Sequence, residues 1–264
     1  MLKLIDIHKT FNPGTINEKV ALNGVDLHLN EGDFVTVIGG NGAGKSTMLN
    51  AVAGAWPVDS GKIIIGGTDV TKLSEYKRAA YLGRVFQDPM TGTAATMGIE
   101  ENLALAKRRG KSRLLRPGIT RQEREEYHEL LKILGLGLED RLTSKVGLLS
   151  GGQRQALTLL MATLKKPQLL LLDEHTAALD PKTAAKVLEI TDMIVNRDHL
   201  TTMMITHNMR DAITHGNRLI MMWEGKIILD IQGEEKQKLT VKDLLDKFEE
   251  ASGEEFSNDS ALLS

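Results

Sequence analysis

The chain has 264 residues, of which 41% are apolar and 26% are charged, as is ordinary for a globular protein. Its 33 basic and 35 acidic residues leave a formal charge of −2, so the composition provides no overall attraction to nucleic acid or to an anionic membrane surface. Because the chain contains no cysteine, disulfide bonds, thiolate metal sites and cysteine nucleophiles are all excluded.

The hydropathy profile gives no sign of a membrane-spanning segment. Residues 1–9 alternate charged and apolar side chains and lack the apolar block of a signal peptide. The longest uncharged run, residues 46–58, is shorter than the roughly 18 apolar residues that a membrane helix needs, and Asn50, Gly54 and Pro57 interrupt it. If the protein works at a membrane, we expect another molecule to recruit it there.

Strand patterns dominate the first part of the chain. Residues 2–8 and 24–29 alternate apolar and polar side chains, as half-buried strands do. Residues 34–38 form a nearly continuous apolar run, which is typical of a strand buried on both faces, and a helix is expected to begin near Lys45. Further short strands are predicted at residues 62–65 and 82–86.

A helical segment interrupts this pattern at about residues 90–146. Helix-compatible spacing occurs at residues 99–109 and 120–134, and a basic cluster at residues 108–116 lies between them. That cluster is either a solvated face or a docking surface. Beyond it the sequence predicts helices at 151–164 and 181–196 and strands at 169–172 and 201–205. This alternation favours a mostly parallel sheet covered by helices. The acidic, aperiodic residues 249–264 are expected to be poorly ordered.

A glycine-rich segment joins the strand at 34–38 to the helix at Lys45. Gly39-Gly40-Asn41-Gly42-Ala43-Gly44-Lys45-Ser46 fits the pattern G-x-x-x-x-G-K-[ST]. Glycines let backbone N–H groups converge on phosphate oxygens at the positive end of a helix. Lys45 can reach the β- and γ-phosphates, and the Ser46 hydroxyl can bind Mg²⁺. The alternative is a glycine turn that precedes a lysine by chance, and the strand–loop–helix context makes it rare.

The strand predicted at residues 169–172 ends in two carboxylates. Beside the phosphate loop, Asp173 would hold Mg²⁺ through its water shell. Taken alone, four leucines and an aspartate equally fit a core strand with a capping residue. The adjacent Glu174 favours the functional interpretation, because it can orient the water that attacks the γ-phosphate or accept its proton.

A second candidate anion cradle lies at Leu149-Ser150-Gly151-Gly152-Gln153-Arg154-Gln155, a predicted helix start with a serine cap and paired glycines. This segment resembles the signature motif of the ABC (ATP-binding cassette) ATPases. With residues 39–46, Asp173-Glu174 and His207, it identifies that family from residue 1 to about residue 231. The resemblance implies an α/β fold in one domain, residues 1–248: a P-loop NTPase core with a mostly parallel sheet, an antiparallel β edge subdomain and a helical subdomain inserted at about 90–146.

The resemblance implies further site residues. Phe11 takes the place of the aromatic that stacks on adenine, with an ordinary apolar loop residue as the alternative. Gln87 matches the glutamine that contacts Mg²⁺ and links to the membrane subunit, and His207 matches the histidine that senses the γ-phosphate. The implied nucleotide-binding set is Phe11, Gly39, Asn41, Gly42, Ala43, Gly44, Lys45, Ser46, Thr47, Ser150, Gly151, Gly152, Gln153 and Asp180; the catalytic set is Glu174, His207 and Gln87, and the Mg²⁺ set is Ser46, Gln87 and Asp173.

One position departs from the family pattern. His175 stands where the family usually has proline after the catalytic glutamate. It is either merely tolerated there or adds a titratable group near the γ-phosphate. The remaining histidines are interpreted as surface residues: His8, His28, His128, His199 and His215.

The resemblance also implies partners. Two cassettes, as a homodimer or a pair, would bind ATP and Mg²⁺ head to tail between Lys45 of one and residues 150–152 of the other. Integral membrane permease subunits and an extracytoplasmic substrate-binding protein are expected, with the chain peripheral at the cytoplasmic face of the membrane and no nucleic-acid partner. Residues 173–180 resemble a bacterial importer subgroup proposed for aromatic amino acids. The alternatives are a soluble ABC ATPase of DNA repair, translation or cluster assembly, and a regulator that does not hydrolyse ATP.

Overall fold

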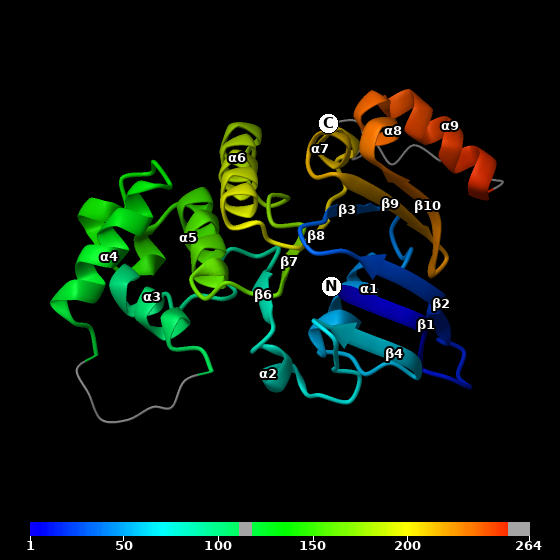
Figure 1. Ribbon diagram of the computed structural model, residues 1–264, viewed down its shortest axis with the longest axis horizontal. Helices are drawn as coiled ribbons and strands as arrows, with labels where there is room; N and C mark the ends of the chain where they lie inside the picture. Colours follow the sequence, from blue (N-terminus) through cyan, green and yellow to red (C-terminus); the bar gives the residue numbers. More distant parts are fainter. Residues whose placement is uncertain (111–117, 253–264) are drawn as a thin grey trace.

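The structure, a computed structural model, describes residues 1–110 and 118–252. Its strands form two sheets, which lie beside each other in Figure 1. The smaller sheet is antiparallel, with the order β2-β1-β4-β5, and corresponds to the expected antiparallel edge. Its strands are β1 (Leu2–Phe11), β2 (Lys19–Leu29), β4 (Ser60–Ile65) and β5 (Thr68–Asp69).

The larger sheet carries the strands that precede the candidate site. Its order is β10-β9-β3-β8-β7-β6; β10 pairs with β9 antiparallel and the other pairs are parallel, which confirms the predicted mostly parallel sheet. Its strands are β3 (Phe34–Ile38), β6 (Leu82–Val85), β7 (Leu169–Asp173), β8 (Thr202–Ile205), β9 (Arg218–Trp223) and β10 (Lys226–Gln232).

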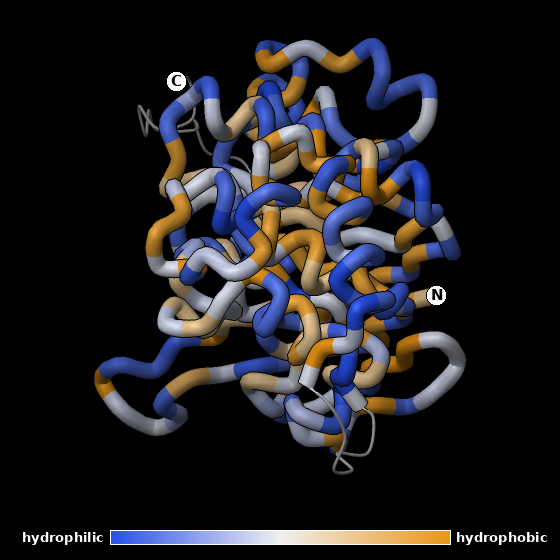
Figure 2. The backbone as a smooth tube through the Cα atoms, turned by 90° about the vertical axis from the view of Figure 1, so that its left-hand side faces the viewer, coloured by the Kyte–Doolittle hydropathy of each residue, from blue (hydrophilic) through white to orange (hydrophobic). Residues whose placement is uncertain are grey.

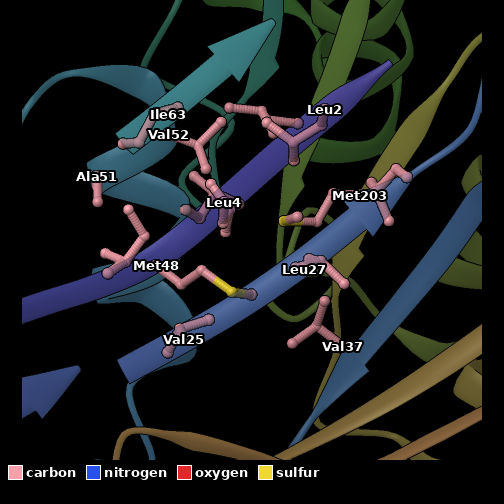
Figure 3. Packing of buried hydrophobic residues seen from close by; sticks show 14 of the residues in the cluster. Leu2, Leu4, Val25, Leu27, Val37, Met48, Ala51, Val52, Ile63 and Met203 are labelled. Atoms are coloured by element: carbon pink, nitrogen blue, oxygen red, sulfur yellow. The ribbon is translucent and has the colours of Figure 1, made fainter. Parts of the chain in front are cut away.

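One hydrophobic core lies around α1 (Lys45–Ala53), where side chains of the two sheets meet. Figure 3 shows Leu2 and Leu4 of β1, Val25 and Leu27 of β2 and Met48 of α1 directed into the same space. Every second residue of β1 contributes at its start, since alternate strand side chains point to one face. Each such side chain contributes roughly 1.5–3 kcal/mol when fully buried.

A second core joins the other face of the large sheet to the helical part of the molecule. It lies under α5 (Gly151–Thr163) and α6 (Pro181–Asp198) and extends to α3 (Ile99–Lys107) and α4 (Arg121–Lys132). Figure 1 shows α3 and α4 outside α5, at the end away from the small sheet. The described residues between 90 and 146 contain no strand.

The basic cluster expected at residues 108–116 is only partly described. Arg109 donates hydrogen bonds to the carbonyl oxygens of Ala162 (3.5 Å) and Lys165 (3.2 Å), so its guanidinium packs against the end of α5. Arg108 lies 3.6 Å from a carboxylate oxygen of Glu123. Residues 111–116 lie outside the described residues. Both described arginines therefore have partners within the protein, Arg109 at the end of α5 and Arg108 on α4.

Short helices cover the β9–β10 end of the large sheet. They are α7 (Met209–Thr214), α8 (Gly233–Lys238) and α9 (Val241–Ser252), while α2 (Glu75–Arg78) precedes β6. Phe248 of α9 is fully buried and packs edge-to-face on Trp223, with ring centroids 5.2 Å apart. Residues 249–252, expected in a poorly ordered tail, form the last turn of α9; residues 253–264 lie outside the described residues.

Figure 2 shows hydrophobic segments running through the middle of the molecule and most hydrophilic segments near its outline. Within residues 1–110 and 118–252, none of the helices combines the length and the apolar character needed to span a bilayer. The methionines are largely internal: Met203 and Met204 of β8 and Met221 and Met222 of β9 are all buried.

Candidate functional site

The phosphate loop joins β3 to α1, in the strand–loop–helix context that the sequence predicts. Gly39 has φ 146°, and a Cβ on it would lie 2.3 Å from the carbonyl oxygen of Met222, so no side chain fits there. Gly44, with φ 104°, caps α1. The loop is therefore pressed against β9, with the N-terminus of α1 at its end, and its backbone N–H groups can act on an anion.

Lys45 is the first residue of α1 and is only 5% exposed. Its ammonium donates hydrogen bonds to the carbonyl oxygens of Gly39 (2.7 Å) and Gly40 (3.1 Å). Burial lowers the pKa of Lys45, while the nearby carboxylates of Glu174 and Asp173 act in the opposite direction. A cation is thus held at the mouth of the loop with two acidic groups close by.

Two pockets meet at Glu174 and His207. The first, of about 230 Å³, is lined by Phe11, Lys19, Ala21, residues 41–47, Glu174 and His207. The second, of about 860 Å³, contains Gln87 and residues 39–41 next to the same glutamate and histidine, and continues along α6. The structure thus brings together the predicted phosphate-loop residues, Phe11, Gln87, Glu174 and His207.

Glu174 follows β7 and has a left-handed backbone, with φ 46°. Its N–H donates to the carbonyl oxygen of Ile205 (3.1 Å), which ties it to the end of β8. The Glu174 Oε1 atom lies 2.5 Å from Nε2 of His207. A carboxylate fixed in this way beside a phosphate loop can orient a water molecule and accept its proton.

Asp173 ends β7 and lies near Lys45. Its carboxylate is 3.3 Å from Nη2 of Arg84, a β6 residue that the sequence analysis missed, and the same nitrogen donates to Oδ1 of Asn50 (2.8 Å). Burial raises the pKa of Asp173, and Arg84 opposes that rise. The sequence feature that could have revealed Arg84 is that it is the single charged residue in the otherwise apolar strand segment 82–86.

Gln87 lies just after β6, and the segment before it is tied to α5. Gln155 is fully buried and donates from Nε2 to the carbonyl oxygen of Phe86 (2.9 Å). Phe86 also lies under the guanidinium of Arg84, 4.5 Å from its ring centroid. The helix that begins at Ser150 therefore holds the chain next to Gln87.

Phe11 is the last residue of β1, not a loop residue, and pairs with Lys19 across β2. Its ring is edge-to-face with Trp56, with centroids 5.1 Å apart, and the ammonium of Lys9 lies 5.6 Å from the ring centroid. A Cβ on Gly42 would lie 2.8 Å from Nζ of Lys19. Lys19 and Trp56 were not predicted, because Lys19 reaches the site through the register of the β1–β2 pair and Trp56 through a tertiary contact with Phe11.

The segment at residues 149–155 begins a helix with a serine cap, as the sequence predicts, and lies apart from the phosphate loop. Ser150 caps α5 by accepting from the Gln153 N–H (3.3 Å), and the Gln153 side chain accepts from the Ser150 N–H (3.2 Å). A Cβ on Gly152 would lie 2.1 Å from Cγ2 of Thr183, so α5 and α6 are in close contact there. Asp180 caps α6 by accepting from the Thr183 N–H (3.1 Å). Residues 150–153 line neither of the two pockets around Glu174.

The structure decides between the two interpretations of His175 and places His215 differently from its expectation. His175 is 1% exposed and lines neither pocket, and burial together with His215 lowers its pKa to about 4. It is therefore not a titratable group directed at the γ-phosphate. His215, expected on the surface, is half-buried, with Nδ1 2.7 Å from a carboxylate oxygen of Asp192.

Comparison with known proteins agrees with this geometry. The model of the family described as "ABC transporter" matches residues 22–177. The chain is 44% identical over 256 residues to the "Tyrosine transport ATP-binding protein" of Clostridioides difficile (strain R20291), covering 95% of this chain and 100% of that protein. It is 35% identical over 232 residues to "Methionine import ATP-binding protein MetN" of Rhizobium etli, where the match covers 86% of this chain and spans 60% of that protein's length.

Solved structures show the same fold. The ATP-binding cassette MJ0796, in a dimeric post-hydrolysis state bound to ADP and Pi, matches with a TM-score of 0.74 and 30% identity, covering 88% of this chain and 98% of that one. A nucleotide-free cassette from an ABC transporter matches with a TM-score of 0.73 and 26% identity, covering 90% of this chain and 93% of that one. The predicted fold class is confirmed, and the chain belongs to the ABC transporter family as an ATP-binding cassette.

Proposed function

We propose that the chain is the ATP-hydrolysing subunit of a bacterial importer of small solutes, with aromatic amino acids as the cargo. The observation that carries the proposal is the Glu174–His207 contact beside the phosphate loop, because it joins a candidate base to a nucleotide cradle. The cargo rests on the full-length match to a tyrosine transport ATP-binding protein and on the sequence at residues 173–180.

In the proposed mechanism the phosphate loop and the N-terminus of α1 hold the phosphates of ATP, and the Lys45 ammonium leaves the loop carbonyls to neutralise them. Phe11 stacks on the base. Glu174 orients the attacking water and takes its proton, while His207 keeps the glutamate carboxylate aligned and contacts the γ-phosphate. The barrier is lowered by position and charge, as in other phosphoryl transfers.

Mg²⁺ suits the oxygen donors that the site offers. The Ser46 hydroxyl opens α1, and Asp173 and Gln87 lie at the ends of the adjacent strands β7 and β6. Among the described residues no group of three or more acidic or histidine side chains could hold a metal alone, so phosphate oxygens would complete the coordination. When bound, the ion neutralises charge on the β- and γ-phosphates.

The position of residues 150–153 away from both pockets supports a composite site. A second cassette, packed head to tail, would bring its Ser150, Gly151 and Gly152 to the ATP held by Lys45, with Asp180 at the dimer interface. The dimeric cassette structure that matches this chain supports such a pairing. Membrane permease subunits would dock on the helical subdomain and near Gln87 at the cytoplasmic face, and a substrate-binding protein would deliver the cargo.

Reconstitution tests the proposal against a soluble ABC ATPase. The chain is co-expressed with a candidate permease, and the complex is isolated in detergent and placed in vesicles with ATP inside and a candidate substrate-binding protein outside. Uptake of labelled tyrosine that requires both chains, and is lost with Glu174→Gln, is the expected result. ATP hydrolysis without any association with a membrane protein would favour the soluble class. Uptake of a solute that is not an aromatic amino acid in its place would refute the cargo alone.

A further inference from the structure

The candidate base lies in an unfavourable backbone conformation. Glu174 has φ 46°, in the left-handed region that residues with a side chain rarely adopt, so surrounding contacts must hold it there. One such contact is the hydrogen bond from its N–H to the carbonyl of Ile205. The carboxylate on the other side of the same residue reaches His207. Contacts that restrain the residue after Glu174 therefore help to determine where the Glu174 carboxylate lies.

The next residue is anchored in the protein interior. His175 is 1% exposed, and its Nε2 lies 3.0 Å from Oγ1 of Thr191, a residue of α6 that is also 1% exposed. The Thr191 hydroxyl donates its only proton to the carbonyl of Val187 (2.8 Å). Thr191 Oγ1 therefore accepts from His175, which requires the proton on Nε2. The direction of both hydrogen bonds is thus determined.

These contacts connect the base to a long, well-packed helix. The neighbouring α6 residues Val187, Leu188 and Ile190 are all buried, so the Thr191 hydroxyl is a fixed point of attachment. His175 has no access to the two pockets around Glu174 and cannot touch the nucleotide. An effect of His175 on hydrolysis would therefore be indirect, and Glu174 is the neighbouring site residue through which it would act.

We propose that His175 is a positioning residue, which holds Glu174 toward the phosphate loop by hydrogen-bonding the turn after it to Thr191 of α6. The proposal rests on the assignment of Glu174 as the base. Because the hydrogen bond joins two side chains, substitution of either His175 or Thr191 removes it.

The experiment compares Thr191→Val, His175→Leu, the double variant and His175→Gln in the full chain. Valine has nearly the shape of threonine, and glutamine can still donate a hydrogen bond toward Thr191. We expect Thr191→Val and His175→Leu to lower kcat about tenfold each, with the Kd for ATP within about twofold of the wild type. The double variant should be no worse than the poorer single variant. His175→Gln should recover most of kcat.

Thr163→Val is the matched control. Thr163 of α5 is buried and its hydroxyl likewise donates to the carbonyl four residues earlier, Leu159 (3.0 Å), but none of the described histidines hydrogen-bonds to it. Its kcat should equal that of the wild type. Hydrogen exchange adds a readout without turnover, because the amide of Glu174 should exchange faster in Thr191→Val than in Thr163→Val.

Three outcomes would overturn the positioning role. They are a wild-type kcat in Thr191→Val, additive losses of kcat in the double variant, and a loss of kcat in Thr191→Val that Thr163→Val shows to the same extent. Thr191→Val keeps the test informative if His175→Leu does not fold. Glu174→Gln separates the two levels of the argument. If it hydrolyses ATP normally, the assignment of the base fails; if it is inactive while Thr191→Val is normal, the role of His175 alone fails.

Discussion

Phe11 and Lys19 lie opposite each other at the open end of the β1–β2 pair, and both line the pocket around the phosphate loop. The antiparallel register thus presents an aromatic ring and an ammonium group together, whatever the conformation of the loop at residues 12–18 that joins the strands. Within the described part of the chain, Lys19 forms no ion pair. The ring is supported from the side by Trp56.

Lys19→Met should weaken ATP binding by about three- to tenfold. The Lys19 ammonium lies near Gly42 and, among the described residues, has no ion-pair partner, so it can attract the phosphates from a partly solvent-exposed position. The loss should shrink as salt rises, since salt screens exposed charges. Equilibrium binding of ATP at low and high ionic strength measures this. Lys62→Met, in the exposed part of β4, is the control. An ATP affinity in Lys19→Met equal to that of the control would show that Lys19 does not act on the nucleotide.

Lys45→Ala should abolish stabilisation by Mg-ATP. In the wild type, ATP at 100 times its Kd adds about 2.7 kcal/mol to the free energy of unfolding, which a thermal shift detects. The variant should remain folded without nucleotide, because the interactions that Lys45→Ala removes, hydrogen bonds to the carbonyls of Gly39 and Gly40 and attraction to the nearby carboxylates, are confined to the site. A wild-type thermal shift in the variant would mean that the phosphate loop has been misassigned.

Glu174→Gln should bind ATP but hydrolyse it about 10²- to 10⁴-fold more slowly, since it removes a general base. The variant should then accumulate as a closed dimer with ATP, which gel filtration detects. Glu189→Gln on α6 lines the same large pocket and serves as the control with normal turnover. A monomer with near-normal hydrolysis would remove Glu174 from the mechanism.

The site of membrane docking can be mapped with single cysteines, which are the only thiols in this chain. Asp88 and Met90 are exposed beside Gln87, and Met90 is 55% exposed, so both should crosslink to the permease in vesicles. Ile99 is unsuitable because it is fully buried at the start of α3. Controls are Lys62 and Lys226, on strands away from the helical subdomain. Efficient crosslinking at the controls instead would place the dock elsewhere.

Local sequence patterns predicted those elements whose buried residues form a clear apolar pattern along the chain. The β3 prediction at 34–38 agrees with the structure, as does the predicted helix start at Lys45. The β9–β10 hairpin was missed, although residues 219–222 form the same kind of continuous apolar run as residues 34–38, and no prediction was made beyond residue 207 for α7, α8 or α9. The four-residue spacing of the apolar residues Leu244 and Phe248 could have predicted α9.

The candidate site likewise contains features that the sequence predicted and features that it did not. Consecutive residues form the phosphate loop, the Asp173-Glu174 pair and the Ser150 cap, so the sequence alone could predict them. Arg84 contacts Asp173 across adjacent parallel strands, and Trp56 meets Phe11 from a turn after α1. Such partners depend on tertiary packing, which a single sequence does not reveal.

Ser150→Arg tests whether the second cradle serves a partner. Ser150 is exposed at the start of α5 and lines neither of the pockets at Glu174, so the substitution should leave ATP binding by the single chain unchanged. In a head-to-tail dimer, however, an arginine there occupies the space that the γ-phosphate of the partner must enter. Hydrolysis should therefore fall to background. Ser150→Ala, which removes the cap of α5 without adding bulk, controls for the roughly 1 kcal/mol that loss of the cap costs.

Mixing Ser150→Arg with Lys45→Ala gives the sharper test. In the mixed dimer one composite site carries both defects and the other carries neither, because each site takes Lys45 from one chain and Ser150 from the other. Activity should thus return in the mixture, up to half of the wild-type rate per mixed dimer if one intact site can turn over. A mixture with no more activity than its parts would require both sites to act together. Wild-type hydrolysis by Ser150→Arg alone, at every protein concentration, would instead establish a site complete within one chain.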